Sequence, residues 1–237
     1  MLSKAYIGVA TPQANPTVEA ELQRMVRSPV QAVFTRLVSD SDQSQQRLLD
    51  YIQQLPEALA SFDTLPLRVF AFACTGSSYL VGAEQEEELV EAAERQHRVQ
   101  TITATQAIRR ELQGRGAHRI ALLAPYPEEL CDAAVDYWGS LGVEVVAVMR
   151  MEIGADTRAI YNIGDDEVQA ALDAFDPADA DLVLLSGTGM PTVATLQHTR
   201  RPVISSNLCL ATEALRRAQS WPPGEAADIH KLLGETD

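Results

Sequence analysis

The chain has 237 residues, of which 46% are hydrophobic and 22% charged, a composition typical of a soluble globular protein. Its formal net charge of −14 repels a phosphate backbone, and no cluster of Lys and Arg offsets that charge, so we exclude nucleic acid as a partner. No apolar stretch is long enough to cross a bilayer, which excludes a membrane-spanning protein.

The first half of the chain alternates apolar runs with amphipathic ones. We predict strands and helices in turn at 5–10, 16–26, 31–38, 44–62, 67–74 and 84–96. Pro16 stands near the first turn of its helix, a favoured place for proline. Pro56 breaks or kinks the second helix.

The second half repeats this order. We predict strands at 118–125, 143–151, 180–187 and 201–207, and helices at 128–142, 165–175 and 210–218. The tail after residue 218 carries turn signals. Apolar strands that alternate with helices predict parallel sheets covered on both faces, which is the α/β class.

The two similar series of alternating strands and helices predict two pseudo-symmetric, Rossmann-like (flavodoxin-like) halves. We assign residues 1–103 to the first and 104–207 to the second, with 208–237 packing back on the first. Ligands of open α/β sheets bind beyond the carboxyl ends of the strands. We therefore expect an active site in the cleft between the halves.

An internal repeat supports this arrangement. The segment "FACTGSS" (72–78) aligns by its Thr-Gly with "LSGTGMP" (185–191), and each ends an equivalent strand. The segment 7–22 likewise resembles 120–135 in layout. If the halves face each other, the four loops that follow these strands meet at one cleft.

Cys74 stands at a predicted strand end and allows two interpretations. Cysteine is among the most buried residue types and often simply packs. The Thr-Gly-Ser-Ser that follows, however, leaves backbone N–H groups free to point at an anion. The same groups would lower the pKa of the thiol, and the thiolate is the reactive form.

The other chemistry-bearing residues give weaker signals. Three cysteines without paired spacing predict free thiols, and the absence of a signal-peptide pattern predicts a cytoplasmic protein. We expect Cys131 to pack in the core, and Cys209 either to pack or to lie beside the site. The histidines lack ligand spacing, so we expect no metal site. No dinucleotide or Walker-A motif supports nucleotide binding.

Four segments, in the right order, resemble the Asp/Glu racemase superfamily and within it the branch of maleate cis–trans isomerase and arylmalonate decarboxylase. They are "IGVATPQANPTVEAEL", "FACTGSSYLVG", "TATQAIRRELQGRGAHRIALLAPY" and "RPVISSNLCLATEALR". The resemblance implies a two-domain α/β fold, no metal and no organic cofactor. It also implies a small carboxylate substrate held between the halves, and it is compatible with a homodimer.

The resemblance also implies roles for particular residues. Cys74 matches a first-half cysteine that acts as a nucleophile in isomerases and as an acid/base in racemases. Asn162 matches a carboxylate contact loosely, and a surface-turn asparagine explains it equally well. The remaining matches imply contacts to a carboxylate substrate, and they are Pro12, Asn15, Thr75, Gly76, Ser77, Tyr126, Gly187, Thr188, Gly189 and Met190.

The sequence departs from the racemase and isomerase pattern at the second cysteine. The internal repeat puts Gly187 opposite Cys74, and the "MP" of the isomerase pattern puts Thr188 there instead. Neither residue is a thiol, and threonine is far too weak an acid to replace one. Racemisation needs an acid/base on each face of a planar carbanion, so a two-base racemase is disfavoured.

Three hypotheses remain open. A Cys74 thiolate can add to an activated double bond and leave after rotation, as in a cofactor-independent isomerase of the maleate isomerase type. Alternatively, a carboxylate can leave as CO₂, with Cys74 protonating the enediolate, as in an arylmalonate-decarboxylase-like lyase with its thiol on the opposite face. The third is a non-catalytic protein that binds a carboxylate.

Overall fold

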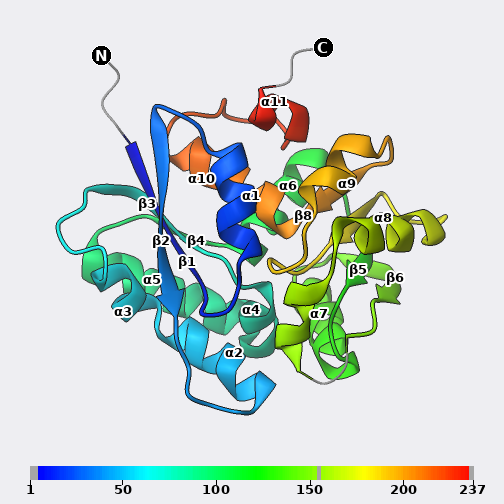
Figure 1. Ribbon diagram of the computed structural model, residues 1–237, viewed down its shortest axis with the longest axis horizontal. Helices are drawn as coiled ribbons and strands as arrows, with labels where there is room; N and C mark the ends of the chain where they lie inside the picture. Colours follow the sequence, from blue (N-terminus) through cyan, green and yellow to red (C-terminus); the bar gives the residue numbers. More distant parts are fainter. Residues whose placement is uncertain (1–4, 154–155, 235–237) are drawn as a thin grey trace.

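The computed structural model describes residues 5–153 and 156–234 and contains two four-stranded parallel sheets (Figure 1). The strand orders are β2-β1-β3-β4 and β6-β5-β7-β8, so the second sheet repeats the first strand for strand. This confirms the predicted α/β class with two pseudo-symmetric halves. Residues 1–4, 154–155 and 235–237 of the predicted halves lie outside the described residues.

The described part of the first half holds nine elements of secondary structure, which follow the predicted order closely. The strands are β1 (Ala5–Pro12), β2 (Val30–Leu37), β3 (Leu67–Phe72) and β4 (Thr101–Thr103). The helices are α1 (Thr17–Met25), α2 (Ser44–Gln53), α3 (Leu55–Ala60), α4 (Thr75–Val81) and α5 (Ala83–His97).

The rest of the chain forms the second sheet and its helices. The strands are β5 (Arg119–Ala124), β6 (Glu144–Arg150), β7 (Leu182–Leu185) and β8 (Val203–Ser205). The α-helices are α6 (Ala104–Arg115), α7 (Glu128–Ser140), α8 (Asp165–Ala174), α9 (Val193–His198), α10 (Ser206–Arg217) and α11 (Ile229–Leu233), and a 3₁₀ helix, η1, spans Thr157–Asn162.

The central strands are apolar because helices cover both of their faces. Val69 to Phe72 of β3 and Ile120 to Ala124 of β5 are fully buried. A strand buried on both sides reads as a continuous apolar run, which is why these strands are readable from the sequence.

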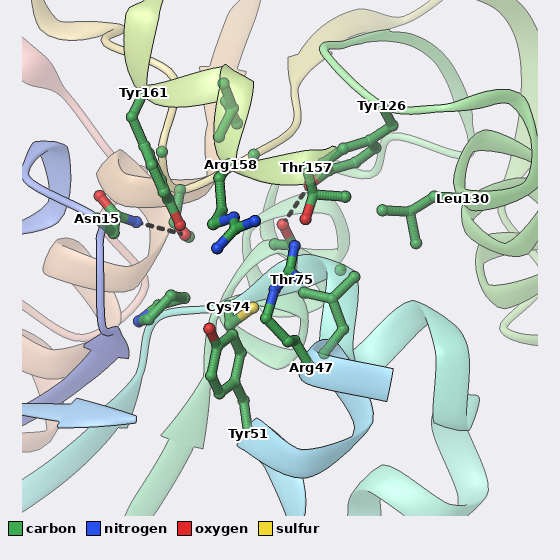
Figure 2. Close-up of a pocket in the computed structure, with 17 residues that line it drawn as sticks. Asn15, Arg47, Tyr51, Cys74, Thr75, Tyr126, Leu130, Thr157, Arg158 and Tyr161 are labelled. Atoms are coloured by element: carbon green, nitrogen blue, oxygen red, sulfur yellow. Dashed lines mark hydrogen bonds between the residues drawn. The ribbon is translucent and has the colours of Figure 1, made fainter. Parts of the chain in front are cut away.

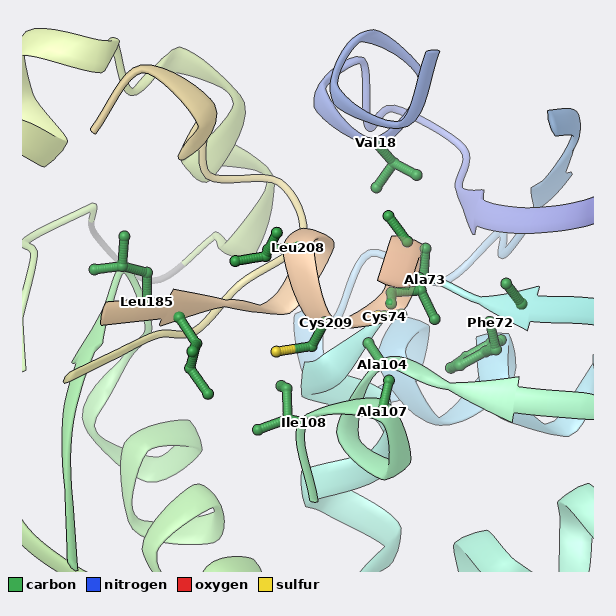
Figure 3. Close-up of a cluster of buried hydrophobic side chains, with 14 of the residues drawn as sticks. Val18, Phe72, Ala73, Cys74, Ala104, Ala107, Ile108, Leu185, Leu208 and Cys209 are labelled. Carbon is green, nitrogen blue, oxygen red and sulfur yellow. The ribbon is translucent and has the colours of Figure 1, made fainter. Parts of the chain in front are cut away.

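Helices α6 and α10 follow the equivalent strands β4 and β8 and pack against each other between the sheets. Figure 3 shows Cys209 of α10 on the side that faces Ala107 and Ile108 of α6, and Leu208 on the other side of α10. All four are nearly or fully buried. Helix α10 also contacts α1, β3 and β4, so the last long helix of the chain packs on the first sheet.

Hydrogen bonds join the halves near these helices. Glu21 of α1 accepts the backbone N–H groups of Thr192 (2.5 Å) and Val193 (2.8 Å), where α9 begins. The Thr17 hydroxyl donates to the carbonyl of Gly189 (2.8 Å). Burial raises the pKa of Glu21, against the lowering effect of the hydrogen bonds it accepts.

The sequence analysis did not predict strand β4, helices α4, α6 and α11, or the 3₁₀ helix η1. Residues 75–77 are predicted as a turn, whereas residues 75–81 form α4, although Gly and Ser are poor helix formers. Residues 75–79 are buried, so tertiary packing supplies the stability that intrinsic propensity does not. Helix α9 was also missed. As predicted, the segment around Pro56 is broken, and it forms α2 and α3.

Candidate functional site

One pocket lies at the carboxyl ends of the strands, between the two halves (Figure 2), with an empty volume of about 480 Å³ including some open solvent. The loops after β1, β3, β5 and β7 all contribute to it, as the internal repeat predicted. The predicted residues that line it are Pro12, Asn15, Cys74, Thr75, Gly76, Tyr126, Gly187, Thr188 and Gly189.

Three of the predicted residues do not line this pocket. Ser77 lies behind it and donates a hydrogen bond to the Cys74 sulfur. Met190 is fully buried in the core. Asn162 ends η1 with an exposed side chain, whereas its neighbours Ile160 and Tyr161 face the pocket. The expectation that Asn162 contacts a carboxylate was therefore placed on the wrong residue of η1, because the 3₁₀ turn directs that side chain outward.

Cys74 is the residue that directly precedes α4, and its side chain lies at the pocket wall with 5% of the residue exposed. The Ser77 hydroxyl lies 3.2 Å from the sulfur and donates to it. The backbone N–H groups of Gly76 and Ser77 also lower the pKa of the thiol. Burial nevertheless dominates and raises that pKa above its ordinary value.

This direction corrects the sequence prediction of a lowered thiol pKa. The amide groups are present as expected, but the sequence did not show how completely the surrounding helices bury the sulfur. Without a ligand, Cys74 is therefore a neutral thiol at neutral pH.

Asn15 has a structural role and also faces the pocket. Its Oδ1 accepts the backbone N–H groups of Thr17 (2.9 Å) and Val18 (3.2 Å) at the start of α1. Its Nδ2 is thereby directed across the cleft to Thr188 Oγ1, at 3.5 Å. The turn interpretation and the pocket interpretation of Asn15 are both compatible with this geometry.

Thr188 stands near the place where a second cysteine was expected. Its hydroxyl donates to the carbonyl of Ala73 (2.9 Å), directly beside Cys74. Because its hydrogen is already used, the Thr188 hydroxyl has no proton to offer a ligand in this geometry. The second thiol is thus replaced by a hydrogen bond between the halves.

We expect Thr188→Val to reduce the free energy of unfolding by about 1 to 3 kcal/mol, because the buried Ala73 carbonyl loses its donor. Urea denaturation measures this difference. Thr188→Ser keeps the hydroxyl and is the matched control. A Thr188→Val protein as stable as the unmutated one would contradict a stabilising role of this hydrogen bond.

Gly187 has a φ of +129°, a region that residues with side chains rarely adopt. A Cβ at this position would also lie 3.1 Å from Ile160 Cδ1 and 3.4 Å from the Tyr126 hydroxyl. The pocket wall is therefore backbone here, close to the Tyr126 hydroxyl. That hydroxyl lies 2.6 Å from Thr75 Oγ1.

The sequence analysis missed both cations of the pocket, Arg47 of α2 and Arg158 of η1. The Arg47 side chain is 2% exposed and donates to the carbonyls of Ser41 (3.2 Å) and Asp42 (2.9 Å). It also pairs with Asp156 at 2.8 Å. A lone arginine among glutamines on a predicted helix gave no signal that it would point into a site.

Arg158 of η1 also binds the carboxylate of Asp156. Its Nη2 lies 2.7 Å from Asp156 Oδ2, and the Arg158 guanidinium is the largest cause that lowers the pKa of Asp156 to about 2. Figure 2 shows the Arg158 guanidinium directed toward the centre of the pocket. Among the described residues, those that line the pocket include two arginines and no carboxylate, in a chain of net charge −14.

The remaining missed residues supply apolar and aromatic surface. They are Leu48, Tyr51, Leu130, Thr157, Ile160 and Tyr161. Desolvation by burial raises the pKa values of Tyr51 and Tyr161, so these tyrosines stay neutral hydroxyl donors. Among the described residues no cluster of potential metal ligands is present, and no helix is long and apolar enough to span a membrane. Cys131 is buried on α7, and Cys209 lies in the α6–α10 contact, away from the pocket.

The sequence profile of arylmalonate decarboxylase matches residues 7–228. The chain belongs to the arylmalonate decarboxylase family. It is therefore an enzyme of the Asp/Glu racemase superfamily, in the branch that the sequence segments indicated.

Curated relatives in this family are maleate isomerases. The one from Pseudomonas putida is 25% identical, and the match covers 93% of this chain and 95% of the relative. The one from Nocardia farcinica is 25% identical, with 89% of this chain and 88% of the relative covered.

Solved structures of the arylmalonate decarboxylase family share the fold. Maleate isomerase of Pseudomonas putida S16, crystallised with maleate, gives a TM-score of 0.79 at 22% identity, with 93% and 95% of the two chains covered. Arylmalonate decarboxylase gives 0.71 at 18% identity, with 98% and 100% covered. At these identities the likeness establishes the fold alone.

Proposed function

We propose that this enzyme is a cofactor-independent cis–trans isomerase of a small dicarboxylate, of the maleate isomerase type, with Cys74 as its nucleophile. The observation that carries the proposal is that the Cys74 sulfur shares one pocket with Arg47 and Arg158, which come from opposite halves. A cation from each half suits a ligand with a carboxylate at each end. Both curated relatives are maleate isomerases, which supports the same substrate class.

The proposed reaction needs only one sulfur. The Cys74 thiolate attacks one alkene carbon, and the π electrons move onto the far carboxylate, which becomes an enediolate. The C–C bond is now single and rotates. The electrons then return, the C–S bond breaks and the trans product forms, with no net gain or loss of a proton.

The pocket offers donors for the charge that develops. Arg158 Nη1 has no partner among the described residues, while Nε and Nη2 are held by Asp156. Donors held in place before reaction stabilise a developing oxyanion without reorganisation. A likeness to the Nocardia farcinica maleate isomerase, whose C-to-S mutant carries a covalently bound succinylcysteine, supports a covalent route.

The test is direct. Purified protein is incubated with maleate in buffered D₂O or H₂O, and proton NMR follows the alkene signals. We expect the maleate signal to fall and the fumarate signal to rise without added cofactor. Protein in which Cys74 is replaced by alanine is the control, and conversion by that variant would exclude the proposed nucleophile.

A second candidate is a decarboxylase of the arylmalonate type, and one observation favours it. The raised pKa of the thiol suits a proton donor to an enediolate better than a resting nucleophile. Apolar side chains such as Leu48, Leu130 and Ile160 offer a dry surface for a departing carboxylate. Release of CO₂ from a phenyl-substituted malonate, with no conversion of maleate, would support this candidate instead.

The pH dependence of kcat/KM distinguishes the isomerase from the decarboxylase, because it reports the pKa values of the essential acid and base in the free enzyme. A nucleophile must be ionised, so isomerase activity should rise by up to about tenfold per pH unit until the raised pKa of Cys74, above the ordinary value of about 8.5, is passed. A proton donor must be neutral, so decarboxylase activity should be level at neutral pH and fall above the same pKa. Initial rates between about pH 7 and 10 check the sign. Activity that falls between about pH 7 and 8.5 would contradict both assignments of Cys74, because the thiol is still neutral there.

A further inference from the structure

The turn formed by residues 187–190 has two unused backbone donors. The Gly187 carbonyl accepts the Met190 N–H at 3.1 Å, so Thr188 and Gly189 occupy the two central positions of a β-turn. Both central residues line the pocket, and their backbone N–H groups have no hydrogen-bond partner among the described residues. Successive N–H groups of this kind suit an anion. The family resemblance implies a carboxylate contact by this turn, and it leaves open what fixes the direction of the donors.

The central peptide of such a turn can take two opposite orientations. Type I and type II β-turns differ by a rotation of that peptide through roughly half a turn, and type II requires a positive φ at the third residue. Gly189 stands at this third position and could adopt either φ, because it has no Cβ. Its φ is not positive, so the turn is of the type I kind. A flip would exchange the directions of the Thr188 carbonyl and the Gly189 N–H.

A side chain of α10 holds the central peptide in one orientation. The Thr188 carbonyl accepts a hydrogen bond from Asn207 Nδ2 at 3.0 Å. Asn207 is 1% exposed and does not line the pocket. In a trans peptide the N–H points away from the C=O of the same group. The bond to Asn207 therefore draws the carbonyl away from the pocket and directs the Gly189 N–H toward it.

Glu21 of α1 decides which end of the Asn207 amide faces the turn. Its Oε2 accepts from the same Asn207 Nδ2 at 2.7 Å, and its Oε1 accepts two backbone N–H groups at the start of α9. Carboxylate and carbonyl oxygens only accept, so the nitrogen of the amide must face both Glu21 and Thr188. The Asn207 Oδ1 is buried without a partner among the described residues, so no bond to that oxygen sets the orientation.

We propose that Glu21 and Asn207 are positioning residues, which hold the central peptide of the 187–190 turn so that the Gly189 N–H donates to the substrate. In the proposed isomerase the acceptor is the carboxylate that becomes an enediolate, and to that extent the proposal rests on the proposed function. The decarboxylase candidate also passes through an enediolate and would use the same donor. Glu21 does not line the pocket and acts through Asn207.

Glu21→Gln tests this arrangement with a small change. The amide oxygen of the new side chain can still accept the N–H groups at the start of α9, but its nitrogen then faces Asn207 Nδ2, and neither group accepts. The Asn207 amide is expected to rotate by half a turn, which deprives the Thr188 carbonyl of its donor. We expect kcat for maleate to fall by about ten- to a hundredfold, because the Gly189 donor is no longer held in place.

A double-mutant cycle with Asn207→Leu shows whether Glu21 acts through Asn207. Leucine is similar in size to asparagine and has no donor, so Asn207→Leu should lower kcat by a similar factor. In this background Glu21→Gln should change kcat by less than about twofold, because the side chain through which it acts is gone. KM should change less than kcat in each variant, since a donor to a developing charge matters most in the transition state.

Thr192→Val is the matched control. The Thr192 hydroxyl lies 3.2 Å from Glu21 Oε2 and 2.9 Å from Ser205 Oγ, so this change also removes buried hydrogen bonds between the halves. It leaves the Glu21 carboxylate and the Asn207 amide in place. We expect a lower free energy of unfolding, measured with urea, and a kcat within about threefold of that of the unmutated enzyme.

NMR observes the proposed donor directly. The dipeptide Thr-Gly occurs twice in the chain, at 75–76 and 188–189. Protein labelled with ¹³C at the threonine carbonyl and ¹⁵N in glycine therefore gives two amide signals in a spectrum that selects for the bond between the two labels. Thr188→Ser removes one of these signals and so assigns it to Gly189.

In the Cys74→Ser background, which prevents turnover, we expect maleate to shift the Gly189 proton downfield, and Glu21→Gln should largely abolish this shift. A Gly189 signal that neither maleate nor phenylmalonate moves would overturn the proposal. So would full kcat in Glu21→Gln, an equal further loss in the Asn207→Leu background, or a loss in Thr192→Val as large as in Glu21→Gln. If the unmutated protein binds maleate without converting it, the proposed isomerase is wrong, whereas the Gly189 shift still decides on the positioning residues.

Discussion

Cys74→Ser is expected to lower kcat for maleate isomerisation by about 10³-fold or more, since the serine hydroxyl is a far weaker acid and nucleophile than the thiol. The exchange keeps the size of the side chain and its place before α4. The dissociation constant of maleate should stay within about threefold, because the groups expected to hold the carboxylates are untouched. Proton NMR gives the rate and calorimetry gives the affinity.

Cys209 provides the control for this experiment. It is equally a buried free thiol, but it lies in the α6–α10 contact and does not line the pocket. We expect Cys209→Ala to retain activity at temperatures below unfolding. If Cys74→Ser keeps a substantial rate, sulfur is not the reacting atom and both candidate reactions lose their central residue.

Arg47→Met is expected to lower both stability and activity. The change removes the hydrogen bonds to the carbonyls of Ser41 and Asp42 and the ion pair to Asp156. We expect a loss of about 2 to 4 kcal/mol in the free energy of unfolding, because the guanidinium is buried and its partners lose their donor. The fall in kcat/KM for maleate should exceed tenfold, because the pocket loses the cation of the first half.

Arg158→Met separates the effect on activity from the effect on stability. Arg158 binds the same Asp156 but is half exposed, and exposed ion pairs contribute little to stability. We expect an unchanged urea midpoint together with a comparable fall in kcat/KM. If Arg158→Met has normal activity, the cation of the second half does not hold a carboxylate, and the argument for a dicarboxylate is withdrawn.

Much of this fold can be predicted from local sequence patterns. Apolar runs such as 67–74 mark buried parallel strands, and the loops that follow them must meet at one edge of a sheet. For that reason the sequence predicts that Cys74, Asn15 and the 187–189 turn lie at one pocket. The profile match over residues 7–228 then confirmed the superfamily that these segments resembled.

The features that the sequence did not predict depend on contacts between segments that are far apart in the chain. Arg47 lies on one face of α2, and only the approach of η1 turns that face into a pocket wall. The direction of the Cys74 pKa depends on the burial that all the surrounding helices produce together. No local pattern contains this information, so the cations were missed and the thiol was predicted to be acidic.

The pairing of α6 with α10 bears on how a ligand gets in and out. A hinge-like separation of the halves would pull this helix pair apart and break the links from Thr17 to Gly189 and from Glu21 to α9. A shift of η1 would break the bridge from Arg47 to Asp156 and the hydrogen bond from the Thr157 N–H to Ser44. We therefore expect a ligand to enter beside η1 while the α6–α10 pair holds the two halves together.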